Sequence, residues 1–542
     1  MRAEAWIALV FTVAAAVAGL SGALPDDEGQ LTYLGAVIVV RAPLAGLFFQ
    51  KIHPSISAIS APFAALGFRA FLLGHAALAG AAVYLLGASA RRIVGERAWL
   101  ASLLLAASPM FFLSAATGQS NSTATLFFAA ALALLDGSPR ARLLAGVIAG
   151  AGLWSRYEQA PYLLGLVAYD VLRNRRWQMA AGALGYVALY SLAGAAYHGS
   201  ALWLFTRPPV LLRETAPTTM TELALDRMQL GSLLSGLCLV SPLFLSPLLL
   251  SRAALGAPMV RLLAAMFGLS LAAQLALPQL GRLFNYDYTA RYFVCHLPAL
   301  ALLAAVVAKE PGAAPRRALA LAAAGIALAL WIPRGPHILP LALLCVLPGI
   351  AWPRGRADVA TAGGALVAAA LALWVDGRRH TSALPQDGLG AAADYVARAP
   401  GAPPVYTNLH QLQAMAERAG LRGRVRFLVG YDMVIELAAE LGARPTRQSA
   451  AIFRAITPHL YGEALWPCAC PHSIPAGSLL VVAQSERAAQ VYDLQRWTGG
   501  SDRVLARGAV EVWRARAPLA LPCMRRPAWL DADTVNLPCA AP

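Results

Sequence analysis

Residues 5–28 read AWIALVFTVAAAVAGLSGALPDDE, an unbroken apolar run that ends in an acidic triplet. The apolar part, residues 5–24, is long enough to cross the roughly 30 Å hydrocarbon core of a bilayer as one helix. Similar runs recur as far as residue 376. Hydrophobic residues make up 58% of the 542 and charged residues only 13%, too few to cover a soluble protein of this size. The sequence therefore predicts a polytopic α-helical membrane protein.

Charges, prolines and polar clusters divide the apolar sequence into about thirteen predicted spans. They are residues 5–24, 69–90, 98–117, 120–135, 141–155, 158–173, 178–199, 229–250, 258–279, 291–308, 317–333, 337–353 and 357–376. A cleaved signal peptide is the alternative interpretation of the first span, because residues 21–23 are small enough to resemble a cleavage site. We favour an uncleaved helix, since the run is long for a signal peptide.

The net charge of +16 comes from basic residues in short loops between the spans. Basic loops alternate with acidic or aromatic ones, which by the positive-inside rule predicts a cytoplasmic N-terminus in a cell inner (plasma) membrane. An odd number of spans then places the C-terminus outside. Nucleic-acid binding would need a water-facing basic patch, which this distribution does not provide.

The sequence predicts two domains. Residues 1–376 form the transmembrane domain, with a first outer loop at 25–68 that contains interfacial helices and a second outer loop at 200–228. Residues 377–542 are less apolar and form a predicted extracytoplasmic soluble α/β domain. Its clearest predicted helices are residues 409–419 and 486–497, and its clearest strands are residues 425–429, 479–483 and 509–514.

Four cysteines fall in this outward domain, where the environment permits oxidation. Disulfides are the favoured interpretation, and the sequence leaves all three pairings open. A zinc site that includes His459 and His472 is the alternative, although the Cys-x-Cys spacing is unusual for zinc. The cysteines are Cys468, Cys470, Cys523 and Cys539.

The acidic triplet Asp26, Asp27 and Glu28 follows the first span on the outer face. A solvated acidic loop is one interpretation, but acidic residues contribute little to membrane orientation. A carboxylate in a partly desolvated cleft can act as a general base on an acceptor hydroxyl or amine. We therefore expect a catalytic role for this triplet.

Residues 49–54, FQKIHP, place a lysine and a histidine later in the same outer loop. Lys51 could simply extend from an interfacial helix toward water. It could also hold a phosphate or phosphate-like leaving group. His53 is a weaker candidate for contact with a substrate.

Two further basic positions lie at the predicted outer ends of spans. Arg156 is followed by Glu158, and it is either a membrane-interface anchor or a phosphate contact with Glu158 as its partner. Arg291 and Tyr292 allow the same two interpretations. The polar turn at residues 119–122, QSNS, is a candidate lining of the same cleft. No metal site is predicted among these residues.

With these motifs the chain resembles the GT-C superfamily of integral-membrane glycosyltransferases. The resemblance is to the branch of protein O-mannosyltransferase-like and lipid A aminoarabinose transferase-like enzymes, of the family 39 type. Asp27-Glu28 matches an Asp-Glu pair in that family's first outer loop, and residues 49–54 loosely match an aromatic-Glu-Lys-Pro-Pro motif, with Gln50 in place of the acidic residue. Residues 154–158 and 291–300 resemble two further stretches of the family pattern.

The resemblance implies a polyprenyl-phosphate sugar donor and a lipid, glycan or protein acceptor, in contact with membrane lipids. Asp27 would deprotonate the acceptor, which attacks the anomeric carbon with inversion. Lys51, Arg156 or Arg291 would stabilise the departing lipid phosphate. No cofactor is implied with certainty, and a divalent cation stays an open alternative.

Two other function classes remain. A transporter or flippase of lipid-linked glycans would place ionisable groups near the middle of the membrane and often shows internal repeats. A non-catalytic membrane receptor with an outer ligand-binding domain would leave the acidic first loop unexplained.

Overall fold

The structure is a computed structural model that describes residues 2–20, 27–41, 43–48, 53–206, 242–276, 290–309, 386–407, 423–428, 463–465, 472–483, 499–507 and 510–521. Its contacts divide the chain into two compact units. The first consists of Met1–Ala23, Leu72–Ala196 and Val210–Arg379. The second consists of Leu24–Phe71, Tyr197–Pro209 and His380–Pro542.

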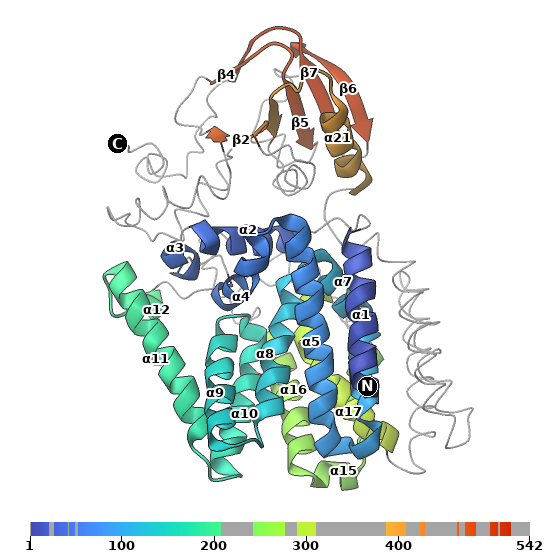
Figure 1. The fold of residues 1–542 in the computed structure, drawn as a ribbon, viewed down its shortest axis with the longest axis vertical. Helices are drawn as coiled ribbons and strands as arrows, with labels where there is room; N and C mark the ends of the chain where they lie inside the picture. The colour runs from blue at the N-terminus through green and yellow to red at the C-terminus, as the bar shows by residue number, and fades with distance from the viewer. Residues whose placement is uncertain are drawn as a thin grey trace, which may run out of the picture. The chain divides into compact units, whose positions relative to one another are not determined.

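The first unit is helical in its described residues (Figure 1). Two of its helices, α5 and α11, extend a few residues beyond the unit, because the unit begins again at Leu72 and this part of it ends at Ala196. The helices of the unit are α1 (Ala3–Leu20), α5 (Phe68–Val94), α6 (Trp99–Ala106), α7 (Pro109–Thr117), α8 (Ser120–Leu134), α9 (Pro139–Leu153), α10 (Ala160–Leu172), α11 (Gln178–His198), α15 (Arg252–Gly256), α16 (Pro258–Ala276) and α17 (Leu297–Lys309). Four 3₁₀ helices join them: η1 (Gly95–Ala98), η2 (Tyr157–Gln159), η3 (Pro242–Leu249) and η4 (Ala290–His296).

Three helical stretches in the described part of the chain are long and apolar enough to cross a membrane, namely Ala3–Leu20, Phe68–Ala106 and Gln178–His198. They coincide with the predicted spans at 5–24, 69–90 and 178–199. Shorter apolar helices fall in the spans predicted at 120–135, 158–173, 258–279 and 291–308. The spans predicted at 317–333, 337–353 and 357–376, and most of 229–250, lie outside the described residues.

The span predicted at 98–117 is not one continuous helix, because the chain breaks it into α6 and α7. Ser108 has extended backbone angles, φ −72° and ψ 118°, and Pro109 opens α7. A proline disfavours the helical conformation of the residue before it and lacks the N–H that would continue a helix. A Ser-Pro dipeptide also begins α9, with Ser138 as the N-cap and Pro139 as the first residue of the helix. The Ser138 hydroxyl accepts a hydrogen bond from the Ala141 N–H at 3.3 Å.

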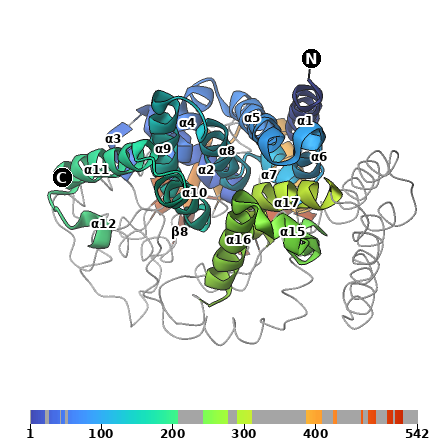
Figure 2. The ribbon, with the colours of Figure 1, turned by 90° about the horizontal axis from the view of Figure 1, so that it is seen from below.

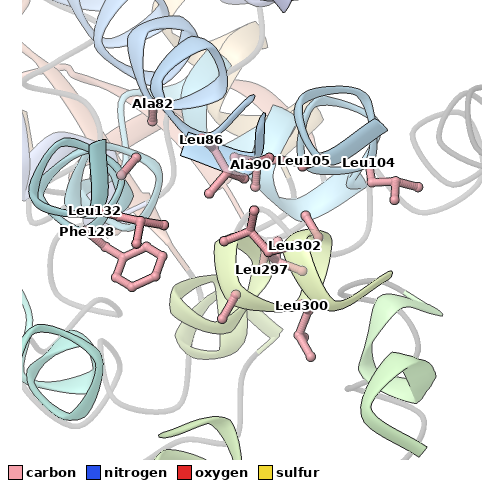
Figure 3. Close-up of a cluster of buried hydrophobic side chains, with 14 of the residues drawn as sticks. Ala82, Leu86, Ala90, Leu104, Leu105, Phe128, Leu132, Leu297, Leu300 and Leu302 are labelled. Carbon is pink, nitrogen blue, oxygen red and sulfur yellow. The ribbon is translucent and has the colours of Figure 1, made fainter. Parts of the chain in front are cut away.

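The core of the first unit is built from leucine, alanine and phenylalanine on α5, α6, α8 and α17. In the view of Figure 2, α17 runs beside α6 and α16, and these pairs are in contact. Figure 3 shows the side chains that these helices direct toward one another, including Leu86, Leu105, Leu132 and Leu302. Each of these four is buried. Large apolar side chains on α1 and α11 instead face outward, as expected of helices that contact lipid.

Two glycines of α9 let its backbone approach α11 closely. A Cβ added to Gly146 would collide with the Met179 carbonyl oxygen, and one added to Gly150 would lie 2.9 Å from the Ala183 carbonyl oxygen. Gly182 on α11 meets the backbone of α9 in the same way. This is the small-residue packing by which membrane helices approach one another.

The second unit contains the helices of the first outer loop, α2 (Asp27–Arg41), α3 (Pro43–Phe48) and α4 (Pro54–Ala64), and the short helix α12 (Trp203–Thr206). Helices α2 and α3 lie in the first outer loop at 25–68, where interfacial helices were predicted. Their position in the membrane interface stays a prediction. Phe48 packs against the ring of Trp203 at 5.7 Å, and its carbonyl oxygen lies 3.2 Å from His198 Nε2. Most of the outer loop predicted at 200–228 lies outside the described residues.

The second unit also contains a six-stranded mixed sheet in the order β3-β2-β1-β5-β7-β6. The strands are β1 (Val405–Thr407), β2 (Val425–Leu428), β3 (Glu463–Leu465), β5 (Leu479–Ala483), β6 (Ser501–Arg507) and β7 (Val510–Ala515). β1 pairs in parallel with β2 and β5, and β7 pairs antiparallel with β5 and β6. Helix α21 (Gln386–Arg398) packs on β6 and β7, and a separate pair joins β4 (His472–Ile474) to β8 (Leu519–Leu521).

The strands predicted at 425–429, 479–483 and 509–514 are confirmed by β2, β5 and β7. Leu479, Val481 and Val512 are buried against Val396 of α21. Leu480 and Val482 are buried as well, so β5 is covered on both faces, as a central strand is. The predicted helices at 409–419 and 486–497 lie outside the described residues, as do Cys468, Cys470, Cys523 and Cys539 and with them the predicted disulfides.

Candidate functional site

A buried polar region lies inside the apolar first unit, where the end of α7 meets α8. Gly118 ends α7 with a left-handed φ of +74°, and Gln119 returns to an extended conformation before α8 begins. The first turn of α8 therefore places Ser120, Asn121 and Ser122 in the interior, each at most 2% exposed. The polar turn predicted as a cleft lining is thus enclosed by protein.

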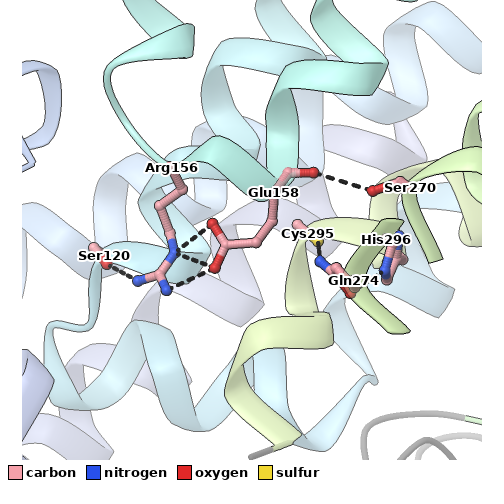
Figure 4. A network of polar contacts seen from close by, with 7 residues as sticks. All are labelled: Ser120, Arg156, Glu158, Ser270, Gln274, Cys295 and His296. Carbon is pink, nitrogen blue, oxygen red and sulfur yellow. Dashed lines mark hydrogen bonds and ion pairs between the residues drawn. The ribbon is translucent and has the colours of Figure 1, made fainter. Parts of the chain in front are cut away.

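A buried ion pair faces this turn from the connection between α9 and α10 (Figure 4). Arg156 Nη2 donates to Glu158 Oε1 at 2.9 Å, and Nε lies 3.3 Å from both carboxylate oxygens. Arg156 Nη1 donates to the Ser120 hydroxyl at 2.7 Å. The exposed fraction of the two charged side chains is 4% for Arg156 and 0% for Glu158. Arg156 therefore has the partner that the sequence suggested.

An ion pair in this position is costly unless its geometry is good. Each charge loses several kcal/mol of hydration when it leaves water, and mutual attraction together with added hydrogen bonds must offset that loss. The two-sided contact between guanidinium and carboxylate and the Ser120 bond meet this condition. Ionisable groups inside a membrane domain mark functional sites by default. The pair is therefore the first candidate for function in this unit.

A second polar chain runs beside the pair on α16, η4 and α10. The Ser270 hydroxyl donates to the Glu158 backbone oxygen at 3.3 Å, which joins α16 to η2. His296 Nε2 donates to Gln274 Oε1 at 2.9 Å, since an amide oxygen can only accept. The Tyr162 hydroxyl lies 2.6 Å from the other ring nitrogen of His296, and Gln274 Nε2 donates to Cys295 Sγ at 3.4 Å. Both nitrogens of this fully buried histidine are thus engaged.

A third buried contact connects α5 to α8. His75 Nδ1 lies 2.8 Å from the Thr123 hydroxyl, and both residues are fully buried. Helices α5, α8, α10 and α16 contribute polar groups to the interior of the unit, together with η2 and η4. Within the described residues, the interior of the unit thus contains a polar region beside its apolar core.

Gln159 has a side chain whose hydrogen-bonding capacity the protein does not meet. It is 0% exposed and follows Glu158 directly, yet its amide nitrogen and oxygen have no partner within the described structure. The indole nitrogen of Trp154, five residues earlier, is also buried without a partner among the described residues. A buried polar group without a hydrogen-bond partner costs about 1–3 kcal/mol, so these atoms lower the stability of the fold.

The remaining predicted site residues fall into two groups. Asp27 and Glu28 form the first turn of α2, and His53 immediately precedes α4, so all three belong to the second unit. Arg291 and Tyr292 lie in η4, which packs against η2 in the first unit. The structure thus brings the element with Arg291 and Tyr292 to the turn that contains Arg156 and Glu158. Asp26 and Lys51 lie outside the described residues.

Sequence reasoning missed Gln159, His75, Gln274, His296 and Tyr162. The signal for three of them was present, because His75, Gln274 and His296 interrupt predicted spans with polar side chains. Their partners are 21 to 134 residues away along the chain, beyond any local pattern. Within the described ranges, no group of three or more His, Cys, Asp or Glu side chains could hold a metal ion.

The comparisons with known proteins agree with the predicted resemblance. Residues 53–200 match the family described as dolichyl-phosphate-mannose-protein mannosyltransferase. The crystal structure of ArnT from Cupriavidus metallidurans bound to undecaprenyl phosphate aligns at 15% identity with a TM-score of 0.54, over 93% of this chain and 97% of that one. The apo crystal structure of the same protein aligns at 16% identity with a TM-score of 0.52 over the same shares. Among curated proteins none matches the sequence.

At these identities the structural likeness shows a common fold. The family match covers the segment from His53 through most of α11 and includes Arg156 and Glu158. The resemblance to the GT-C superfamily that the sequence predicted is confirmed by the family match and by the shared fold.

Proposed function

We propose that this chain, which has the fold of the GT-C membrane glycosyltransferases, is a membrane enzyme. It transfers a sugar from a polyprenyl-phosphate-linked donor to a lipid, glycan or protein acceptor. The observation that carries the proposal is the alignment over 93% of this chain with a structure that holds undecaprenyl phosphate. Its second support is the buried ionisable region around Arg156, which an inert membrane scaffold would not need. The reaction takes place at the extracytoplasmic face of the plasma membrane in this proposal.

Asp27 is the proposed general base. It takes the proton of an acceptor hydroxyl or amine as that atom attacks the anomeric carbon of the donor sugar. The bond between the anomeric carbon and the phosphate oxygen breaks, the lipid phosphate leaves with the bonding electrons, and the configuration inverts. Asp27 is the first residue of α2, where the helix dipole favours negative charge. Asp26 and Glu28 flank it, and Asp26 is to be tested as a substitute base.

The leaving phosphate needs a cation that is not already neutralised. Lys51 and Arg291 are the proposed contacts, with His53 and Tyr292 beside them in the sequence. Arg156 is already satisfied by Glu158 and Ser120, so its proposed role is to fix the turn that leads into η2. Charge stabilisation by one such contact is typically worth about 10²–10³ in rate.

The soluble part of the chain completes the proposed architecture. We propose that residues 377–542 form an extracytoplasmic α/β domain, on the evidence of the mixed sheet and α21. Its proposed task is to shape access of the acceptor. The total of about thirteen spans and the cytoplasmic N-terminus belong to the same proposal.

The test is transfer by the purified protein. The full chain in lipid nanodiscs is supplied with polyprenyl-phosphate sugars, and the products are identified by mass spectrometry against envelope lipids, glycans and secreted proteins from cells with and without the gene product. We expect Asp27→Asn to lower the transfer rate by about 10²–10⁴ while membrane insertion is unchanged. Asp26→Asn is the matched control and should retain most activity.

Two outcomes would contradict the proposed enzyme or its general base. Normal transfer by a protein that carries both Asp27→Asn and Asp26→Asn would refute the assignment of the general base. Movement of an intact lipid-linked glycan between the faces of a vesicle, without transfer of its sugar, would replace the enzyme with a flippase.

A further inference from the structure

A cavity of about 290 Å³ lies within the second unit, among the helices of the first outer loop. Tyr33, Val37, Val40 and Arg41 of α2 form one wall. The end of α4 and the start of α5 form the other, through residues that include Ala65 and Phe68. None of these residues takes part in the polar region around Arg156, so the cavity is a separate feature of the molecule.

The sequence explains why the cavity exists. Tyr33 packs edge-on against Phe68 at 5.0 Å and against Phe71 at 5.1 Å, which fixes α2 to the first turn of α5. The chain between α4 and α5 turns at Gly67, whose φ of +101° favours glycine. Ala65 and Gly67 add almost no side-chain volume there, and no atom lies within 4 Å of a Cβ built on Gly67. Aromatic contacts therefore hold the helices apart while small residues leave space between them.

The lining side chains are apolar apart from Arg41 and the hydroxyl of Tyr33, and the accessible surface of the cavity is part polar and part apolar. Tyr33, Val37 and Phe68 are buried and form the inner surface. Arg41 is the last residue of α2, and its side chain is exposed. It makes no ion pair with any residue that the structure describes. The cavity thus offers an apolar surface and one available guanidinium, and its lining contains no carboxylate or nucleophile that would suggest chemistry.

Large apolar side chains that adjoin the lining residues along the chain are exposed. Val40 is 42% exposed, Leu44 is 62% exposed and Leu66 is 79% exposed. In water such a group would be an unfavourable patch. At the boundary between headgroups and hydrocarbon, apolar side chains enter the lipid and an arginine meets the phosphates, which is the arrangement of interfacial helices.

We propose that this cavity binds an anionic glycerophospholipid of the surrounding bilayer. The guanidinium of Arg41 holds the lipid phosphate with two parallel N–H donors, and the first carbons of an acyl chain fill the apolar part. The volume is at the lower end of the range for ligand pockets, which suits part of one lipid whose remainder stays in the membrane. Free phosphate would leave the apolar wall unused.

A lipid in this position would steady α2. Arg41 lies fourteen residues after Asp27 on the same helix, a rise of about 21 Å. The bound lipid therefore braces, at one end, the helix that begins with the proposed general base. This consequence rests on the proposed function, whereas the binding itself does not.

The experiment is native mass spectrometry of the full chain released from nanodiscs that contain phosphatidylglycerol and phosphatidylethanolamine in equal amounts. We expect preferential retention of phosphatidylglycerol by the natural chain. Arg41→Gln should lower that retention roughly 10-fold, the typical effect of one lost charge-assisted hydrogen bond. Ala65→Phe should lower it by filling the cavity, and because Ala65 is exposed this change does not disturb the core.

Arg69→Gln is the matched control, since Arg69 is an exposed arginine in the first turn of α5 that does not line the cavity. It should retain the lipid as the natural chain does. Equal retention of both lipids, unchanged retention by Arg41→Gln, or an equal loss with Arg69→Gln would each overturn the proposal. A further arm adds undecaprenyl phosphate or inorganic phosphate. Displacement of phosphatidylglycerol by either at equal concentration would overturn it as well, in favour of a donor-lipid or a simple anion site.

Because the readout is lipid retention, it does not depend on transfer. Loss of the proposed enzyme activity in every assay would leave this result standing. Failure of lipid retention would likewise leave the assignment of Asp27 untouched.

Discussion

The buried pair between Arg156 and Glu158 allows a quantitative test by a double-mutant cycle. Glu158→Gln keeps the shape of the side chain but leaves a guanidinium charge that is 4% exposed without a counter-charge. Arg156→Met leaves the fully buried carboxylate alone. Removing one partner of such a pair costs about 3–5 kcal/mol, because the survivor has lost both its water and its partner.

The double variant should recover most of this loss. Replacing both members of a buried pair with groups of similar volume is often neutral or stabilising. The double variant loses the 2.7 Å hydrogen bond from Arg156 Nη1 to the Ser120 hydroxyl and keeps a buried amide in place of the carboxylate, at a cost of about 1–3 kcal/mol. We therefore expect a coupling energy of about 3 kcal/mol or more between the two positions.

The assay is thermal unfolding of the detergent-solubilised full chain, followed by tryptophan fluorescence. Each single variant should melt about 3–4 °C lower than the natural chain, and the double variant should lie well above both. The pair Arg92–Asp136 is the matched control, because its contact of 3.0 Å has side chains that are 46% and 49% exposed. Its variants should differ from the natural chain by no more than about 1 kcal/mol. Additive losses at Arg156 and Glu158 would refute the reasoning.

Three further changes follow from particular contacts. Gln159→Met should raise the free energy of unfolding by about 1–3 kcal/mol, since it removes two buried polar atoms without partners, and a lower melting temperature would show that the amide is satisfied. Gly146→Leu should separate α9 from α11 and lower the melting temperature, whereas Gly185→Leu on α11, where nothing lies within 4 Å of the added Cβ, should not. Leu300→Ala in the core should cost about 2–5 kcal/mol by chemical denaturation, and Leu184→Ala, which is 69% exposed, should cost little.

The helices of the first unit were predictable because their apolar length and charged ends are local properties. The spans at 5–24, 69–90 and 178–199 need only composition and the bilayer thickness. The break at Ser108 was predictable in principle, since the proline that causes it is visible in the sequence. It was missed because the hydropathy of residues 98–117 is continuous across it.

The site was less predictable than the fold. The pair formed by Arg156 and Glu158 could be suggested because its members are two residues apart, but its burial could not. Ser120 reaches Arg156 from 36 residues away, and His296 meets Tyr162 from 134 residues away. Such contacts depend on how helices pack, which one sequence does not specify.

The contacts of Arg156 bear on which cation stabilises the leaving phosphate. Together Arg156 and Glu158 carry no net charge, and the carboxylate lies 2.9 Å from the guanidinium. A phosphate that approached Arg156 would bring a second anion close to Glu158, and like charges in a buried site repel strongly. The phosphate would also have to replace two good hydrogen bonds rather than add to them. We therefore infer that a cation other than Arg156 stabilises the leaving group, with Lys51 and Arg291 as the proposed candidates, and that Arg156 acts on the reaction by holding the shape of the turn before η2.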